Sequence, residues 1–214
     1  MKHHVITIRS IAQSVGAAGR CISSGKQFGL DIKNFDAITP SDNPVDMAMD
    51  LGINVEGFHE VYSRYDNCVA AFMSHFTLWS MCLEQNEEFT IFEHDAIIVN
   101  DIPEYIPYKE VISLGKPSYG KWNDPKTFGV NPLTSKKYFP GAHAYRIRPH
   151  GAEKLINQAK IYAKPTDVYL HLDTFPLLQE YYPWPVEARD TFTTIQKTEG
   201  CLAKHNYNEA YKII

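Results

Sequence analysis

The sequence has no long apolar run, no long run of one charge sign and no Cys-x-x-Cys pair. A membrane span needs about 20 apolar residues, and the apolar run at residues 5–8 is also too short for a signal peptide. A net charge of −4 without a basic stripe argues against a nucleic-acid surface. The four cysteines are expected to be free thiols in a reducing compartment: Cys21, Cys68, Cys82 and Cys201. We therefore expect a soluble, cytoplasmic protein with at most peripheral membrane contact.

What the sequence does contain is enough apolar material for one sizeable core. Hydrophobic residues make up 44% of the 214 positions, which predicts a single domain rather than two. Short runs of β-branched and aromatic residues predict strands at residues 5–8, 35–38, 89–92, 111–114 and 141–147. Apolar spacings and turn signals predict helices at residues 11–28, 44–51, 68–85, 149–163 and 173–181. This alternation is typical of an α/β fold.

Two regions are less regular. Residues 115–140 are rich in Gly, Pro, Lys and aromatics, and they predict a long loop. Its aromatic rings either stack on a sugar or cover the core, and such long loops are usually functional or mobile. The polar tail has weak helical character after residue 204.

An acidic island, Glu93-His94-Asp95, stands inside the apolar stretch of residues 89–100. The apolar residues before it are typical of a strand buried on both faces. Since side chains alternate along a strand, Glu93 and Asp95 are expected to share one face and His94 to point away. Carboxylates at the end of a buried strand need a partner, and a divalent cation with a phosphorylated ligand would fit. The alternative is a strand end whose carboxylates are hydrated.

The helix over residues 68–85 carries a second motif that leads into this island. It contains Ser74-His75 followed by Leu78-Trp79. The two motifs together resemble the core of glycosyltransferase family 25, which has a Ser-His-x-x-Leu-Trp helix before an acidic strand. Further blocks agree with the family in order: residues 35–38, 141–145, 151–155 and 165–167. The resemblance spans most of the chain.

The resemblance implies an α/β fold of GT-A-like (Rossmann-like) type, with a mixed, mostly parallel central sheet flanked by helices. Residues 1–214 would form one domain, with a donor-binding half at about 1–100, an acceptor half at about 101–190 and a polar tail. It also implies inverting transfer of a hexose, galactose or glucose, from a nucleotide-sugar donor, commonly UDP-linked. The acceptor would be a hydroxyl of a glycan or lipooligosaccharide. A divalent cation, Mn²⁺ or alternatively Mg²⁺, would assist.

Candidate roles follow from this chemistry. Asp95 would ligate the metal, and Glu93 would contact the metal shell or the ribose. An inverting enzyme needs a carboxylate base, and the candidates are Asp167 first and Asp173 second. Donor-site support is assigned to Arg9, Arg20, Ser74 and His75, and the acceptor side to Tyr145 and His143.

Several of these assignments have alternatives. Arg9 also fits a surface arginine, His75 a structural histidine, and Asp167 a helix cap. His94 stands where the family often has Asp. If the chain bends at this position, His94 becomes either a candidate metal ligand or a sign of lost metal dependence. The histidine at position 94 and the short chain favour a second function, that of a binding module without catalysis. A metal-dependent phosphohydrolase is the third candidate function.

Overall fold

Seven strands form a central sheet in the order β2-β1-β3-β7-β5-β8-β6. The structure is a computed structural model that describes residues 1–59, 63–190, 192–197 and 212–214. Strands β2, β1, β3, β5 and β8 run in one direction, and β7 and β6 run in the other. The predicted mixed, mostly parallel sheet is therefore confirmed. The strand bounds are Lys2–Thr7 (β1), Ile32–Asp36 (β2), Phe89–Glu93 (β3), Val111–Ser113 (β5), Gly129–Pro132 (β6), Ala144–Ile147 (β7) and Gln179–Tyr182 (β8).

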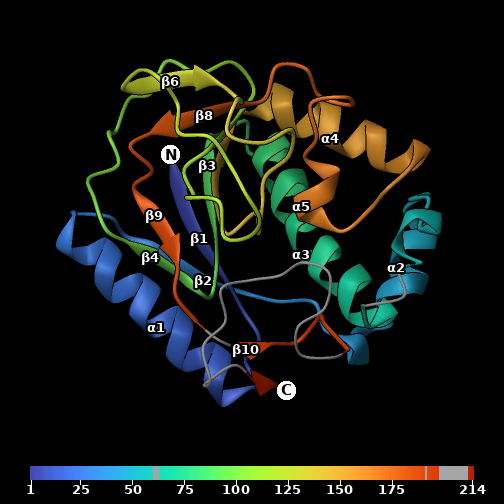
Figure 1. The fold of residues 1–214 in the computed structure, drawn as a ribbon. Helices are drawn as coiled ribbons and strands as arrows, with labels where there is room; N and C mark the ends of the chain where they lie inside the picture. The colour runs from blue at the N-terminus through green and yellow to red at the C-terminus, as the bar shows by residue number, and fades with distance from the viewer. Residues whose placement is uncertain (60–62, 191, 198–211) are drawn as a thin grey trace.

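Helices cover both faces of this sheet, as Figure 1 shows. Helix α1 (Ala12–Gln27) lies on one face. The other face carries α3 (Tyr65–Glu84) and α4 (Pro149–Ile161), with the shorter α2 (Pro44–Asp50) and α5 (Thr166–Tyr169) beside them. Short 3₁₀ turns, Pro40–Asp42 and Glu56–Phe58, flank α2. The α/β alternation read from the sequence therefore gives a three-layer arrangement.

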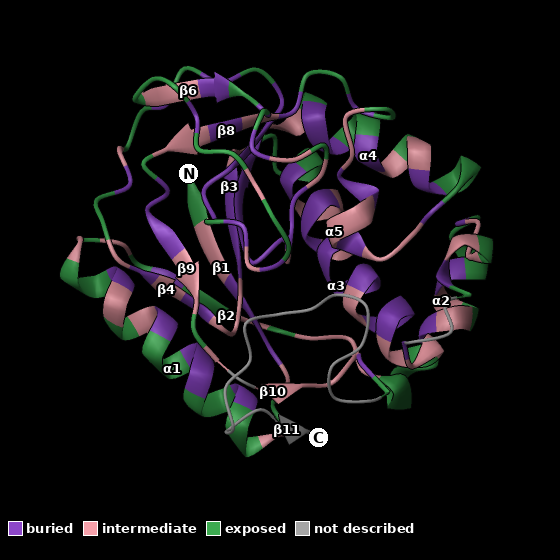
Figure 2. Ribbon diagram, viewed as in Figure 1, coloured by how far each residue is buried: buried purple, intermediate pink, exposed green. Residues whose placement is uncertain are grey.

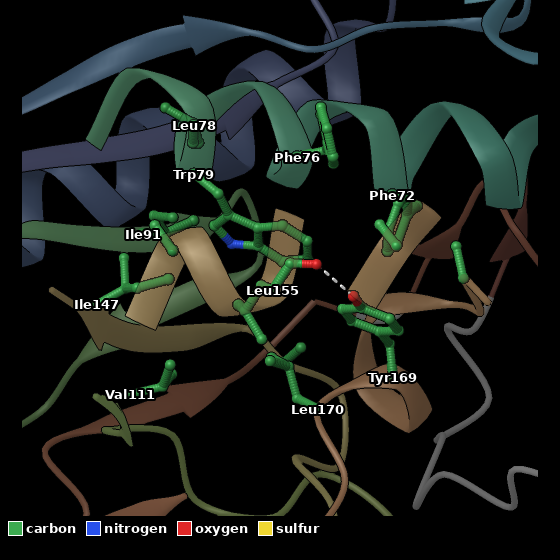
Figure 3. Packing of buried hydrophobic residues seen from close by; sticks show 14 of the residues in the cluster. Phe72, Phe76, Leu78, Trp79, Ile91, Val111, Ile147, Leu155, Tyr169 and Leu170 are labelled. Atoms are coloured by element: carbon green, nitrogen blue, oxygen red, sulfur yellow. Dashed lines mark hydrogen bonds between the residues drawn. The ribbon is translucent and has the colours of Figure 1, made fainter. Parts of the chain in front are cut away.

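Strand β3 is central because its side chains are apolar on both faces. Phe89 and Ile91 belong to the hydrophobic cluster under α3, whereas Phe92 belongs to the cluster under α1. All three side chains are fully buried, and Figure 2 shows the buried residues concentrated along the strands and the inner helix faces. Figure 3 shows Ile91 packed beneath Trp79 of α3. The prediction of a strand buried on both faces is confirmed.

The predicted helix over residues 173–181 is wrong. Pro176 interrupts the segment, and β8 follows it and pairs with β5 and β6. The buried carboxylate of Glu180 accepts the backbone N–H groups of Thr134 (2.6 Å) and Ser135 (2.8 Å), which ties β8 to the end of β6. Tertiary pairing therefore overrides the local helical spacing.

Three other segments contain strands that the sequence analysis did not predict. Strand β6 lies inside the predicted loop of residues 115–140. Strand β4 (Ala96–Ile98) follows the acidic island and pairs with β9 (Val186–Ala188). Near the carboxyl terminus, β10 (Phe192–Thr193) pairs with β11 (Lys212–Ile213). The weak helix predicted after residue 204 falls largely on residues 198–211, outside the described residues.

Cys21 and Cys82 are buried free thiols, and Cys68 is buried. The free thiol predicted at Cys201 lies outside the described residues. Within the described part of the chain, no helix combines the length and apolar character that crossing a membrane requires.

Candidate active site

A cavity of about 250 Å³ opens where the parallel strands β1, β2 and β3 end. Ile8 and Ile11 after β1, and Ile38 after β2, supply apolar walls. One face of α3, together with Glu93 and His94, closes the cavity, and Thr194-Ile195 from the carboxyl-terminal region add to its lining. Ligands of open α/β sheets bind at the carboxyl ends of the strands. The position therefore suits a small-molecule ligand.

Ser74 fixes one wall of the cavity. Its hydroxyl accepts the backbone N–H of Ile38 (2.9 Å) and donates to the Ala70 carbonyl one helical turn earlier (3.0 Å). These two bonds tie the segment after β2 to α3, and the Ser74 side chain is fully buried. Ser74, which is itself part of the cavity lining, therefore holds the segment after β2 against α3.

His75 lies next to Ser74 and reaches the acidic island. Its Nε2 atom is 3.1 Å from Oε1 of Glu93, and its Nδ1 atom is 2.8 Å from the Tyr145 hydroxyl. Burial lowers the pKa of His75 to about 3, so the ring is neutral at physiological pH. Tyr145 is fully buried and also accepts the indole N–H of Trp79 (2.7 Å). The structure thus places Tyr145 behind His75 rather than at a surface open to an acceptor.

The chain turns at His94 and Asp95, between the end of β3 and the start of β4. His94 consequently lines the same cavity as Glu93, whereas Asp95 does not line it. The prediction that Glu93 and Asp95 share one face while His94 points away is therefore wrong. Its Nδ1 atom is 3.0 Å from the Ser14 hydroxyl, which accepts the backbone N–H of Ile8 (2.9 Å). The His94 ring stacks on Phe192 at a centroid separation of 5.0 Å. Strand alternation stops where the strand stops, because a turn re-aims each side chain.

Asp95 has a carboxylate oxygen, Oδ1, that is buried and has no hydrogen-bond partner among the described residues. Burial, followed by the charges of Glu93 and Asp190, raises the pKa of Asp95 to about 8. Burial, followed by the charge of Asp167, raises the pKa of Glu93 to about 8. Each shift means that the ionised form is disfavoured as the residues stand. A cation at this position would reverse that preference.

The acidic side chains fit a metal ion that takes only part of its ligands from the protein. Among the described residues, no three His, Cys, Asp or Glu side chains are grouped to form an all-protein metal site. A divalent ion that also binds phosphates needs only one or two carboxylates from the protein. The unpartnered Oδ1 of Asp95, with Glu93 electrostatically coupled to it, fits that smaller set.

Asp167 and Asp173, the two candidate bases, lie in different surroundings. Asp167 is half-buried in the first turn of α5, where it accepts the Tyr119 hydroxyl and the backbone N–H of Val168 (2.9 Å). Its charge acts on both His75 and Glu93. Asp173 is exposed, and its carboxylate is 3.6 Å from Nδ1 of His171. Asp167 is therefore the candidate that shares an electrostatic environment with the acidic island.

Comparison with known proteins identifies the family. The model of glycosyltransferase family 25, described as an LPS biosynthesis protein, matches residues 20–170, which is more than half of the chain. The chain belongs to glycosyltransferase family 25. The match includes α3, the acidic island and Asp167. A search of curated proteins finds no match.

Membership of family 25 makes the protein a glycosyltransferase and implies a sugar donor and an acceptor. The fold agrees, because the mixed sheet with flanking helices is consistent with a Rossmann-like glycosyltransferase. The cavity is lined by residues of the first hundred positions together with Thr194 and Ile195.

The two arginines do not line the cavity. Arg9 is exposed and donates to Asp36 at the end of β2. Arg20 donates to Asp190 (2.6 Å), and the positive charge of Arg20 and the negative charge of Asp190 act on His94 in opposite directions. Arg20 therefore acts on the acidic island together with its ion-pair partner Asp190, whereas Arg9 forms its ion pair at the protein surface.

His143 is buried beside the acidic island. Its backbone carbonyl accepts the N–H of Glu93 (2.9 Å). Both ring nitrogens lack a hydrogen-bond partner among the described residues, and the ring packs against Gly115. A Cβ atom at position 115 would lie 2.5 Å from the ring, so only glycine leaves room for it.

Four residues of this site were not singled out from the sequence: Ser14, Trp79 as a hydrogen-bond donor, Tyr119 and Asp190. Asp190 is 170 positions from Arg20, and Tyr119 is 48 positions from Asp167. No local pattern connects such pairs. Trp79 had a usable signal, because it stands one helical turn after His75 and its indole N–H needs an acceptor when buried.

Proposed function

We propose that this protein transfers a hexose, galactose or glucose, from a UDP-linked donor to a hydroxyl of a glycan or lipooligosaccharide acceptor, with inversion. The observation that supports this is the cavity at the carboxyl ends of β1, β2 and β3, which Glu93 lines, with the unpartnered oxygen of Asp95 two residues further along the chain. The apolar walls suit a nucleoside, and the carboxylates suit the polar end of the donor.

Asp95 and Glu93 are the residues that would hold a divalent cation, Mn²⁺ or Mg²⁺. When bound, such an ion supplies Lewis-acid stabilisation of the diphosphate leaving group. Asp95 offers its unpartnered Oδ1 atom. Glu93 is held at one oxygen by His75, which directs the carboxylate along the cavity wall.

Asp167 is the proposed general base for the acceptor hydroxyl. A base in an inverting transfer must remove the hydroxyl proton as the new bond forms. The hydroxyl of Tyr119 and the N–H of Val168 orient the Asp167 carboxylate. Apolar side chains at the cavity, including Ile8 and Ile38, reduce access of the water that would compete with the acceptor.

The test is release of UDP from UDP-galactose or UDP-glucose by purified protein with Mn²⁺. We expect slow release without acceptor and loss of release in Asp95→Ala, with the fold retained by circular dichroism. Asp50→Ala, which changes an exposed carboxylate at the end of α2, serves as the matched control and should match the wild type. Normal turnover in Asp95→Ala would remove Asp95 from the mechanism.

A non-catalytic binding module is the second candidate, and His94 is the observation that favours it. A neutral, hydrogen-bonded imidazole lines the cavity where the family often has a carboxylate. Calorimetry with UDP-hexoses separates the two functions. Binding without turnover over a panel of glycan acceptors supports the module, and release of sugar phosphate in place of UDP supports a phosphohydrolase.

A further inference from the structure

Three buried side chains connect the core of the protein to Glu93. His75 and Trp79 lie one turn apart on α3, and the hydroxyl of Tyr145, on β7, contacts both. The Tyr145 oxygen is 2.7 Å from Trp79 Nε1 and 2.8 Å from His75 Nδ1. All three side chains are at most 1% exposed, so water does not compete for these bonds.

The direction of each hydrogen bond follows from the donors and acceptors available. An indole N–H only donates, so the Tyr145 oxygen accepts from Trp79. The Tyr145 hydroxyl proton then needs an acceptor, and Nδ1 of His75 is the one within reach among the described residues. Nδ1 must therefore be unprotonated, which places the proton of the neutral imidazole on Nε2.

This tautomer determines whether His75 donates or accepts a hydrogen bond on the side of Glu93. Nε2 is 3.1 Å from Glu93 Oε1, so it donates a hydrogen bond to this carboxyl oxygen. In the opposite tautomer, Nε2 would face Glu93 with a lone pair, and the Tyr145 proton would have no acceptor among the described residues. A buried hydroxyl without a partner is costly, so that arrangement is disfavoured.

We propose that Tyr145 and Trp79 are positioning residues that fix His75 in its Nε2–H tautomer, so that His75 donates to Glu93 and keeps it a hydrogen-bond acceptor in the cavity. Glu93 lines the cavity, and its second carboxyl oxygen, Oε2, is the atom that can accept a hydrogen bond from a ligand there. The chemistry it would recognise is a hydroxyl donor, such as a ribose or hexose hydroxyl. This functional part rests on the proposed function, whereas the tautomer does not.

The tautomer is tested first, on the wild-type protein without any ligand. Nitrogen-15 correlation spectra of the labelled histidine rings distinguish a protonated from an unprotonated ring nitrogen, and His75→Gln identifies the His75 signals. We expect the proton on Nε2 and an unprotonated Nδ1. A proton on Nδ1 would overturn the proposal, whatever the activity of the protein.

The link to Glu93 is tested with two substitutions of the same kind. Tyr145→Phe removes the hydroxyl that fixes His75. Tyr169→Phe is the matched control, because Tyr169 is buried, stacks on Trp79 and donates its hydroxyl to the Leu155 carbonyl (2.5 Å), as Figure 3 shows. The control loses one buried hydrogen bond in the same aromatic cluster without touching His75.

We expect Tyr145→Phe to raise the donor KM about fivefold, the effect of one hydrogen bond between uncharged groups, with little change in kcat. It should also produce a mixture of His75 tautomers. Tyr169→Phe should change neither KM nor the tautomer. Equal KM changes in both variants would reduce Tyr145 to a structural residue and overturn the positioning role.

His75 itself allows a test of rescue. The side-chain amide of His75→Gln donates toward Glu93 and accepts from Tyr145, whereas His75→Leu does neither. The donor KM should therefore be closer to the wild-type value in the Gln variant than in the Leu variant. Equal KM values would overturn the proposal. If the wild-type protein neither binds nor turns over a UDP-hexose, the proposed function fails while the tautomer result still stands.

Discussion

The hydroxyl of Tyr119 donates a hydrogen bond to the carboxylate of Asp167, joining the segment after β5 to the first turn of α5. The bond holds a half-buried carboxylate whose charge acts on Glu93 and His75. The segments that carry Asp167 and Glu93 are thus brought together although 74 positions separate the two residues. Glu93 lines the cavity, and the charge of Asp167 acts on Glu93. Under the proposed function, one of these two carboxyl groups would serve the leaving group and the other the attacking hydroxyl.

The first prediction concerns Asp167→Asn. This variant keeps the shape of the side chain and removes its basicity, so donor binding should be retained. The rate of transfer to an acceptor should fall about 10²- to 10⁴-fold, the usual contribution of a general base. Single-turnover transfer from radiolabelled UDP-hexose measures the rate. Asp173→Asn, at the exposed alternative, should transfer at the wild-type rate; a reversed result would make Asp173 the base.

A second prediction uses the raised pKa values of Glu93 and Asp95, both about 8. An unfolded chain ionises these carboxyls near pH 4. Between about pH 4 and pH 8 the folded protein therefore holds protons that the unfolded chain has released, so these groups make the free energy of unfolding fall as pH rises. Asp95→Asn removes one such group. Its melting temperature relative to wild type should increase from pH 5 to pH 8.

Melting curves in buffer with a chelator check this, and the difference between the two proteins isolates Asp95 from the other titrating groups. A difference that stays constant over this pH range contradicts the assigned shift. Addition of Mn²⁺ should raise the wild-type melting temperature more at pH 8 than at pH 6, because a metal binds the ionised carboxylate. Asp95→Asn should lose most of that gain.

The third prediction tests the cavity itself. Ala71 lines it from α3 and is only half-buried, so Ala71→Leu should fill part of the 250 Å³ volume without disturbing the core. Affinity for UDP should fall at least tenfold by calorimetry, while the melting temperature changes little. Thr77→Leu is a control on the same helix, at a half-buried position that does not line the cavity. If both variants bind UDP like the wild type, the nucleotide lies elsewhere.

A fourth prediction concerns two helical glycines. A Cβ atom at Gly151, near the start of α4, would lie 2.5 Å from the Glu110 carbonyl oxygen. Gly151→Ala should therefore destabilise the protein by about 1–3 kcal/mol, the usual cost of overpacking. Gly19 in α1 has no atom within 4 Å of such a Cβ, so Gly19→Ala should stabilise by about 0.5–1 kcal/mol. Urea denaturation measures the free energy of unfolding of both variants, which should fall for Gly151→Ala and rise for Gly19→Ala.

The sequence by itself determined the elements whose signal is local. Apolar spacing predicted helices over residues 11–28 and 68–85, and the structure has α1 at Ala12–Gln27 and α3 at Tyr65–Glu84. The apolar run before Glu93 predicted a strand buried on both faces, and β3 is one. The order of short motifs indicated the family. Each of these signals depends on the periodicity of one segment, which is written in consecutive residues.

Only the tertiary structure decided which side chains meet. Residues 173–181 form a turn and the start of a strand because β5 and β6 supply backbone hydrogen-bond partners. The spacing of residues within the segment does not predict these partners. Arg9 pairs with Asp36 and Arg20 with Asp190, which leaves neither arginine on the cavity wall. Tyr145, 70 positions from His75, becomes its hydrogen-bond partner. The physical reason is that hydrogen bonds and ion pairs act over a few ångströms in space, whereas sequence patterns record only neighbours along the chain.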